Sequence, residues 1–261
     1  MDQQETPQQE KSLKATAIPP LSLPYAVILG SVIIAITIGI TGGFGDTSKS
    51  APSPSAQGAN PAQPQAGQND SAALDNVRPV TKEDHIRGNI KAQVKIVEYS
   101  DMECPFCKQL HNTLKQIMSE YESGGKVAWA YRHFPIDQLH SKARKQAEAT
   151  ECAAGLGGND VFWKYIDRIY EITPSGNGLD MTELQKTATL VGLSLPAFNE
   201  CLDSGRYAQN VIDDQTNAGQ TGGRGTPWSI VIAKNGKKFP VNGAMPYESI
   251  KQIVEQALAE K

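Results

Sequence analysis

The sequence VEYSDMECPFC (residues 97–107) ends an apolar run and contains two cysteines with two residues between them. Apolar residues that repeat at intervals of three and four predict a helix over residues 105–122, so the helix begins next to Cys104. Free backbone N–H groups and the dipole at a helix N-terminus favour an anion, and we therefore expect a lowered pKa for the Cys104 thiol. Pro105 suits the first helical position, where its missing N–H would have no partner. Cys107, one turn further on, is expected to be the more buried thiol.

Two other interpretations of this cysteine pair are a zinc half-site and an inert structural disulfide. A zinc site needs two further ligands, commonly a second close pair, and the sequence contains no such pair. We therefore predict no metal site. The junction between a strand and a helix is the placement that activates sulfur, which favours a redox-active pair over an inert one.

The pattern around the cysteines predicts an α/β fold. Residues 93–99 (QVKIVEY) and 126–133 (KVAWAYRH) are expected to form strands on either side of the helix. So compact a strand–helix–strand unit implies a parallel pair with a right-handed crossover. Helical patterns then fill residues 141–220. The chain is expected to end with strands at 229–233 and 237–241, joined by an Asn235-Gly236 turn, and a helix at 247–259.

The amino-terminal part of the chain contains a long apolar segment that could cross a membrane. Residues 26–40 are apolar and uncharged, and with their neighbours they form a segment, residues 25–44, that is long enough to cross a hydrocarbon core of roughly 30 Å. We expect an uncleaved transmembrane anchor; a cleaved signal peptide and a buried core helix are the alternatives. More lysines precede the segment than follow it closely, so residues 1–24 are expected in the cytoplasm and the rest of the chain outside it.

Residues 45–74 are expected to form a flexible linker. Between residues 46 and 73 there is no Val, Ile, Leu, Met or aromatic residue, and Ser, Pro, Ala, Gln and Gly predominate. Such a segment cannot bury enough apolar surface to offset its chain entropy. The folded domain is therefore expected over residues 75–261.

The charge and the cysteine content of the chain indicate which kinds of partner and which cellular compartment suit it. The chain of 261 residues has a net charge of −3, and its lysines and arginines are scattered, which argues against a nucleic-acid partner. Four cysteines, an even number, suit an oxidising compartment outside the cytoplasm.

Residues 97–107 resemble the active-site stretch of the DsbA-like proteins, the bacterial thioredoxin-fold disulfide oxidases. Residues 225–227 (GTP) are similar to the family's loop with a cis-proline opposite the active site, and the helical block at 141–220 matches the family's insertion. The resemblance extends over about residues 78–260. It implies a thioredoxin fold with a helical insertion between the second and third core strands, preceded by one transmembrane helix and a disordered linker.

The resemblance also implies roles for single residues. Cys104 would be the nucleophile that forms a mixed disulfide with a substrate, and Cys107 would resolve it. Pro227 would be cis and would place the Thr226 backbone against the substrate; an ordinary loop proline is the alternative. Glu98 would be a buried acid that assists proton transfer, with a pKa raised by burial, whereas a solvated Glu98 is the alternative.

Phe106 is a departure from the family pattern. Pro105 and Phe106 lie between the two cysteines and are expected to contact substrates. Strongly oxidising family members often have His just before the second cysteine, where it helps to stabilise the thiolate. Phe106 cannot donate a charge-assisted hydrogen bond, so we expect a less oxidising pair here.

The other two cysteines, Cys152 and Cys201, lie 49 positions apart on predicted helices. We expect a structural disulfide that fixes the helical block, and two buried free thiols are the alternative. His111, two turns after Cys104, is expected to be a surface residue.

These features predict a single-pass protein of the cytoplasmic membrane whose extracytoplasmic domain oxidises cysteine pairs in reduced substrate proteins. The resemblance implies reoxidation by a membrane quinone reductase of the DsbB or vitamin K epoxide reductase type. We expect a monomer without a cofactor. The alternatives are a disulfide reductase or isomerase, and a redox-inactive binding or chaperone module.

Overall fold

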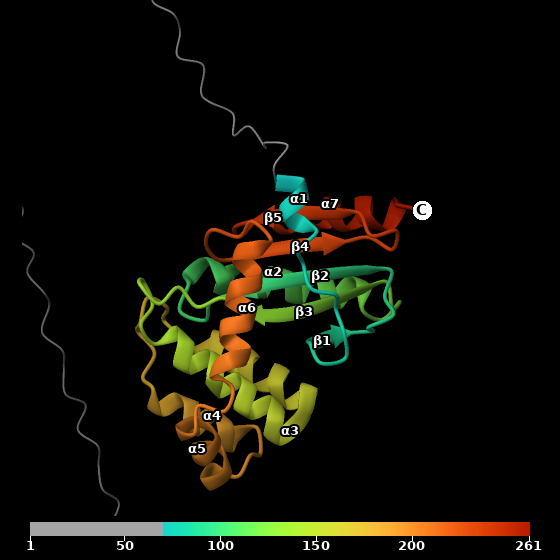
Figure 1. The fold of residues 1–261 in the computed structure, drawn as a ribbon. Coiled ribbons are helices and arrows are strands. Elements are labelled where there is room, and N and C mark those ends of the chain that lie inside the picture. The colour runs from blue at the N-terminus through green and yellow to red at the C-terminus, as the bar shows by residue number, and fades with distance from the viewer. Residues whose placement is uncertain (1–69) are drawn as a thin grey trace, which may run out of the picture. The chain divides into compact units, whose positions relative to one another are not determined.

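The computed structural model of the protein describes residues 70–261 (Figure 1). The predicted cytoplasmic segment, the transmembrane anchor and most of the linker lie outside the described residues. No helix between residues 70 and 261 is both long enough and apolar enough to span a membrane.

A five-stranded sheet with the order β1-β3-β2-β4-β5 forms the centre of the domain (Figure 1). The strands are β1 His85–Gly88, β2 Val94–Ser100, β3 Val127–His133, β4 Trp228–Ile232 and β5 Lys238–Asn242. β2 and β3 are parallel and all other neighbouring strands are antiparallel, which confirms the predicted strand–helix–strand unit around the cysteines. β1 is an edge strand that the sequence analysis did not predict.

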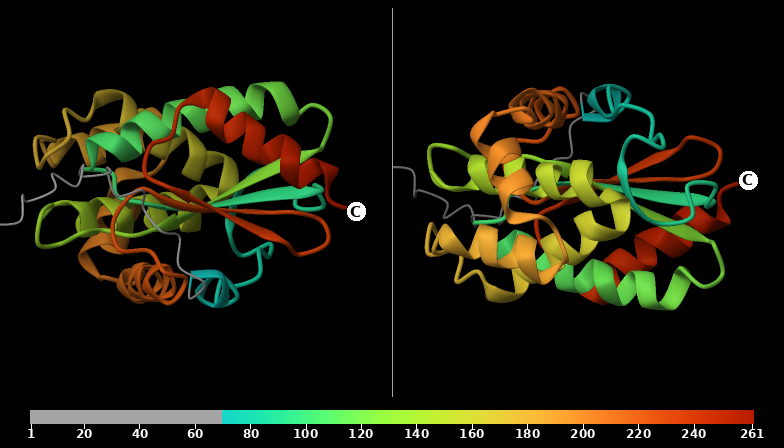
Figure 2. Two further views of the ribbon diagram at one scale, coloured as in Figure 1. Left: turned by 90° about the horizontal axis from the view of Figure 1, so that it is seen from above. Right: turned by 90° about the horizontal axis from the view of Figure 1, so that it is seen from below.

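Helices cover both faces of the sheet. Their bounds are α1 Asp70–Leu74, α2 Pro105–Tyr121, α3 Ala143–Ile172, α4 Thr182–Leu190, α5 Leu195–Asp203, α6 Ala208–Gln220 and α7 Tyr247–Ala259. α2 and α7 pack on one face, and α1 and α6 lie on the other (Figure 2). α3 to α6 form the helical insertion between β3 and β4, and the long α3 is interrupted at Gly158, whose φ is 79°. This arrangement is a thioredoxin-type α/β fold with a helical insertion.

The apolar residues form two clusters, one on each face of the sheet. β2 contributes to both clusters because successive side chains of a strand point to opposite faces. Ile96 packs into the larger cluster with α2, α3 and α7, whereas Val97 and Tyr99 pack into the smaller one. Since both faces are covered, β2 and β3 are buried along almost their whole length.

The folded region begins earlier than the expected linker boundary at residue 74. α1 occupies the last five residues of the predicted linker. Leu74 is only 5% exposed and belongs to the smaller apolar cluster together with Val77. One buried leucine at the end of a polar segment is enough to attach this segment to the sheet, so the expectation of a flexible chain is wrong for residues 70–74.

Candidate active site

Cys104 lies at the N-terminus of α2, directly after β2. It is the N-cap residue with an extended backbone (φ −79°, ψ 122°), and Pro105 occupies the first turn. The Cys104 and Cys107 thiols are both free. Cys107 is completely buried and Cys104 is 5% exposed, while Phe106 between them is 60% exposed. The nucleophile candidate therefore lies next to an exposed aromatic side chain at the protein surface.

The two thiols have very different acidities. A hydrogen bond from the Cys107 thiol, together with the backbone N–H groups of Cys107 and Phe106, lowers the pKa of Cys104 to about 6 against the effect of burial. Burial raises the pKa of Cys107 well above its usual range, and the neighbouring Cys104 raises it further. At neutral pH the reduced pair thus consists of a Cys104 thiolate and a protonated Cys107, and a thiolate is the reactive form of cysteine.

The loop before β4 lies beside Cys104. The Thr226–Pro227 peptide bond is cis, and the Cys104 thiol donates a hydrogen bond to the Thr226 carbonyl at 3.5 Å. Because β4 pairs with β2, with Trp228 opposite Tyr99, the sheet brings this loop to the end of β2 where Cys104 follows. Residues that are 122 positions apart in the sequence meet here.

Glu98 is fully buried in the middle of the sheet, which contradicts the alternative of a solvated side chain. The Ser100 hydroxyl donates to Oε1 at 2.7 Å, and the Trp129 indole donates to Oε2 at 2.9 Å. Burial raises the pKa of Glu98 to about 7, although both hydrogen bonds act in the opposite direction. The Glu98 carboxyl can therefore gain and lose a proton near neutral pH.

Ser100 connects this carboxyl to the buried thiol, and the sequence analysis did not identify it. Its hydroxyl lies 2.9 Å from the Tyr170 hydroxyl. A hydrogen bond between Ser100 and Cys107 is also one of the influences that lower the pKa of the Cys107 thiol. The two-residue spacing from Glu98 was the available signal, because residues i and i+2 of a strand lie on the same face.

Asp101 fixes the loop that leads to Cys104. Its carboxylate is buried and accepts hydrogen bonds from the backbone N–H groups of Glu103 and Ile136, both at 2.8 Å. Nδ1 of His140 lies 2.9 Å from the same carboxylate. No local pattern indicated this role, because Ile136 and His140 come from the distant segment after β3.

Two further expectations concern the helical insertion. Cys152 of α3 and Cys201 of α5 form a disulfide, so the alternative of two free thiols does not apply. His111 is buried, and the expectation of a surface position is wrong. Its Nε2 lies 2.7 Å from Asp167 of α3, and its ring stacks on Tyr170 with centroids 4.3 Å apart, because α2 packs this face against the insertion.

Comparisons with known proteins agree with this fold. The family model described as "Thioredoxin" matches residues 80–256. DsbA2 from Pseudomonas aeruginosa has a TM-score of 0.57 at 24% identity, covering 69% of this chain and 96% of that chain. BdbD from Bacillus subtilis, in its oxidised form, has a TM-score of 0.60 at 23% identity, covering 70% and 96%. Alpha-DsbA1 from Wolbachia pipientis has a TM-score of 0.60 at 20% identity, covering 71% and 96%.

Curated relatives of similar sequence are much longer proteins. The Na(+)/H(+) antiporter NhaA 3 of Salinispora tropica is 31% identical over 191 residues, which are 71% of this chain and 26% of the antiporter. NhaA 1 of Mycolicibacterium gilvum is 29% identical over 165 residues, which are 62% of this chain and 25% of that protein. The chain spans about a quarter of the length of these relatives. The family match shows that the chain belongs to the thioredoxin family, and it shares the DsbA-like fold, with Cys104 and Cys107 as its cysteine pair.

Proposed function

We propose that this protein is a disulfide oxidase that introduces disulfides into extracytoplasmic proteins by transferring its own Cys104–Cys107 disulfide to them. The observation that most supports this is the position of Cys104 at the N-terminus of α2, beside Cys107 and the cis-proline loop, where its pKa is lowered to about 6. A stabilised thiolate favours the reduced form of the pair, and a pair with a stabilised reduced form is the stronger oxidant. The proposal thus follows from where Cys104 lies and from the acidity that this position gives its thiol.

The cycle starts from the disulfide form. A substrate thiolate attacks Sγ of Cys104, the Cys104–Cys107 bond breaks, and Cys107 leaves as a thiolate. Protonated Glu98 then supplies a proton to Cys107 through the Ser100 hydroxyl. The second substrate thiolate attacks the substrate sulfur of the mixed disulfide, and Cys104 leaves as a thiolate.

Atoms and electrons balance in this cycle. The substrate loses two electrons and gains a disulfide, and the cysteine pair takes up the two electrons. Both substrate thiols release their protons to solvent, and one proton is taken up again at Cys107 by way of Glu98. In the reverse direction, the same relay removes the Cys107 proton so that Cys107 can attack a mixed disulfide on Cys104.

Substrate chains would bind around the exposed side of Cys104. Phe106 is 60% exposed and offers an apolar contact, with Pro105 beside it. The Thr226 backbone, 3.5 Å from Cys104 Sγ, and Pro227 form the opposite wall. A binding surface made of backbone and one aromatic ring suits substrates that share a cysteine pair but differ in sequence.

The cellular setting is also part of the proposal. The apolar segment at residues 25–44 would anchor the protein in the cytoplasmic membrane, with the domain outside the cytoplasm as a monomer. A membrane quinone reductase of the DsbB or vitamin K epoxide reductase type would reoxidise the reduced pair.

The test is to mix the oxidised protein with a reduced substrate protein and follow disulfide formation by trapping free thiols. We expect one substrate disulfide per protein molecule, and none with Cys104→Ser or after alkylation of Cys104. A binding or chaperone module would keep its activity after that alkylation, which would refute the proposal.

A reductase or isomerase is the second candidate, and Phe106 is the observation that favours it. Phe106 adds no donor to the Cys104 thiolate beyond its backbone N–H, so the pair would be less oxidising than relatives with His at this position. Trapping the redox state in cells decides between the two directions of electron flow. A mostly oxidised pair supports the oxidase, and a mostly reduced pair supports the reductase or isomerase.

A further inference from the structure

Two imidazoles and one carboxylate meet where the sheet contacts the helical insertion, at residues that the proposed exchange cycle does not use. His85 is the first residue of β1, His133 is the last residue of β3, and Glu151 lies on α3. Glu151 Oε1 is 2.6 Å from His85 Nε2 and 3.0 Å from His133 Nε2. One ligand atom from each of the three residues lies within 4.8 Å of the other two.

These distances are close to those of a metal site. A tetrahedral Zn²⁺ ion with ligands at roughly 2.0–2.2 Å holds neighbouring ligand atoms about 3.4 Å apart. The 3.0 Å between His133 Nε2 and Glu151 Oε1 is shorter than this spacing by a few tenths of an ångström. The 2.6 Å between His85 Nε2 and Glu151 Oε1 must widen by about 0.8 Å, and His85 lies on a short edge strand with a partly exposed side chain. His133 and Glu151 are held in β3 and α3 and need only a small shift, so the outermost ligand, His85, has to move most.

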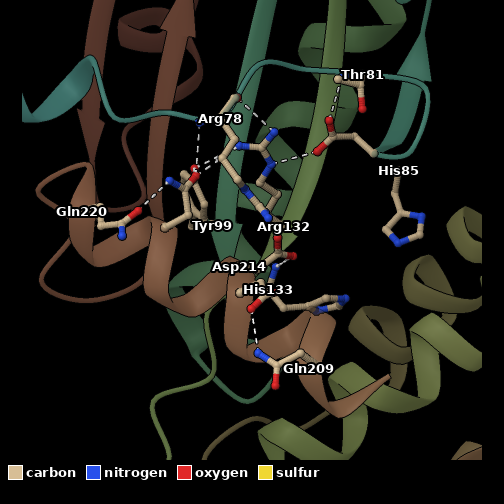
Figure 3. Close-up of polar contacts among 12 residues, drawn as sticks. Arg78, Thr81, His85, Tyr99, Arg132, His133, Gln209, Asp214 and Gln220 are labelled. Atoms are coloured by element: carbon tan, nitrogen blue, oxygen red, sulfur yellow. Dashed lines mark hydrogen bonds and ion pairs between the residues drawn. The ribbon is translucent and has the colours of Figure 1, made fainter. Parts of the chain in front are cut away.

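A cavity of about 440 Å³ gives access to the cluster, with His85 and Glu151 in its wall. Its wall is acidic: the carboxylates of Glu83, Asp84, Asp213 and Asp214 join Glu151, and the arginines are Arg78 and Arg132. Both arginines already have carboxylate partners, since Arg132 binds Asp84 and Arg78 binds Asp214 (Figure 3). A solvent-accessible acidic cavity attracts cations and has room for the water that completes a coordination sphere.

Glu151 itself has no arginine or lysine partner among residues 70–261. All of its side-chain hydrogen bonds and ion pairs in that range go to His85 and His133. The carboxylate is only 8% exposed, and buried charges in proteins are usually paired or coordinate metals. A cation held by both imidazoles and the carboxylate would neutralise it.

We propose that His85, His133 and Glu151 bind one divalent transition-metal ion, with Zn²⁺ as the best match. Two imidazole nitrogens, one carboxylate oxygen and an open position towards water form a donor set typical of Zn²⁺. Ca²⁺ and Mg²⁺ prefer sites built from oxygen ligands and fit two imidazoles poorly. The ion would connect β1, β3 and α3, and it would therefore stabilise the contact between the sheet and the insertion. Without a metal, the cluster is a hydrogen-bonded clamp in which Glu151 holds two histidines.

The experiment uses the full chain without a polyhistidine tag and with Cys104 and Cys107 oxidised, so that no active-site thiol competes for the ion. The protein is stripped with a chelator and titrated with Zn²⁺ and, separately, with Co²⁺. We expect one ion per chain, a higher unfolding temperature, and a visible Co²⁺ spectrum of a nitrogen and oxygen site without sulfur ligands. Because no exchange reaction is involved, the result is independent of the proposed oxidase function.

Variants assign the ion to the cluster. His85→Gln and Glu151→Gln should each weaken binding by at least about tenfold, the lower end of the losses seen when metal sites lose even indirect supporting groups. His111→Gln is the matched control, because it removes an imidazole from another buried histidine–carboxylate pair and should leave binding unchanged. The proposal is overturned if wild-type protein binds no stoichiometric ion, or if His85→Gln binds as tightly as wild type. His85 lies on the edge strand, so this test remains decisive even if Glu151→Gln fails to fold.

Discussion

The strongest influence on the pKa of Cys104 is the thiol of Cys107, and the helix N-terminus acts beside it through the backbone N–H groups of Cys107 and Phe106. The reactivity of one cysteine thus depends on the proton of the other. While Cys107 is protonated, its S–H stabilises the Cys104 thiolate. When Cys107 loses that proton to attack a mixed disulfide, Cys104 is no longer a thiolate but part of the bond under attack. The proton on Cys107 therefore stabilises the Cys104 thiolate in the reduced pair, and its removal allows Cys107 to attack a mixed disulfide.

Removing this donor should make Cys104 less acidic. In Cys107→Ala we expect the pKa of Cys104 to rise from about 6 towards the value of a free cysteine, about 8.5, because the largest stabilising hydrogen bond is lost. Cys107→Ser keeps an O–H donor and should stay much closer to the wild-type value. Thiolate absorbance followed against pH measures both. An unchanged pKa in the alanine variant would show that the helix N-terminus alone sets the acidity.

Ser100 should control how fast the Cys107 proton moves. In Ser100→Ala the hydroxyl between Glu98 and Cys107 is missing, so we expect resolution of a mixed disulfide to slow by about 100-fold, the lower end of the usual effect of a proton-transfer group. Stopped-flow release of a chromogenic thiol measures the rate. Ser100→Thr should restore it.

Ser229→Ala is the matched control for this variant. Ser229 is an equally buried serine that lies opposite Glu98 on β4, and its hydroxyl has no hydrogen-bond partner among the described residues. The rate should remain at the wild-type value. Equal slowing by both alanine substitutions would mean that packing, and not the relay, determines the rate.

Glu98 should make the protein less stable as the pH rises. Its pKa is raised from 4.5 to about 7, so the folded state holds a proton that the unfolded state has lost between these values. Stability is therefore highest below pH 4.5 and falls as the pH rises through about 7, by up to about 3 kcal/mol. In Glu98→Gln this part of the dependence should disappear. Urea unfolding of the oxidised forms from pH 4 to pH 8 measures it, and parallel curves for the two proteins would contradict the raised pKa.

At the scale of elements, the strands and helices with a strong apolar pattern could be predicted from the sequence. α7 was predicted with its observed bounds, β2 was predicted one residue too early at both ends, and α2 was predicted one residue too long at its C-terminal end. β1 and α1 could not be predicted, because they have four and five residues and are stabilised by packing on the sheet, not by their own pattern.

The candidate active site also contains residues that a local sequence pattern reveals and residues that only the fold brings together. Cys104 and Cys107 lie at one junction of strand and helix, so local spacing identified them, and the resemblance to the DsbA-like family pointed to Glu98 on the same strand. The Asp101–His140 contact and the His85–His133–Glu151 cluster join residues far apart in the sequence. Only the folded chain brings these partners together.

The disulfide between α3 and α5 should stabilise the insertion without taking part in exchange. Replacing Cys152 and Cys201 together by alanine opens a loop of 49 positions, and the chain-entropy model gives a loss of about 4 kcal/mol. Urea unfolding at constant redox state measures this loss. We expect the Cys104 pKa and the exchange rate to stay at wild-type values. A large fall in exchange rate in a folded double variant would show instead that this bridge takes part in electron transfer.

At the scale of the whole molecule, Arg132 joins segments that are remote in the sequence. Its guanidinium is 2% exposed and donates to Asp84 at 2.8 Å and to the Tyr99 hydroxyl at 3.1 Å. It also donates to the backbone carbonyls of Arg78 and Pro79, both at 3.2 Å (Figure 3). One side chain of β3 thus fixes the segment that leads into β1 against the centre of the sheet.

Loss of these contacts should destabilise the whole domain. Arg132→Met leaves the Asp84 carboxylate without its partner in a nearly buried position, and removing one member of a buried ion pair costs about 3 kcal/mol or more. Arg168→Met is the control, because Arg168 forms an exposed pair with Glu171, and such pairs contribute less than about 1 kcal/mol. Urea unfolding of both variants at the same pH and redox state gives the two losses. If they are equal, Arg132 does not hold the amino-terminal segment in place, and the sheet must retain that segment through α1 and β1 alone.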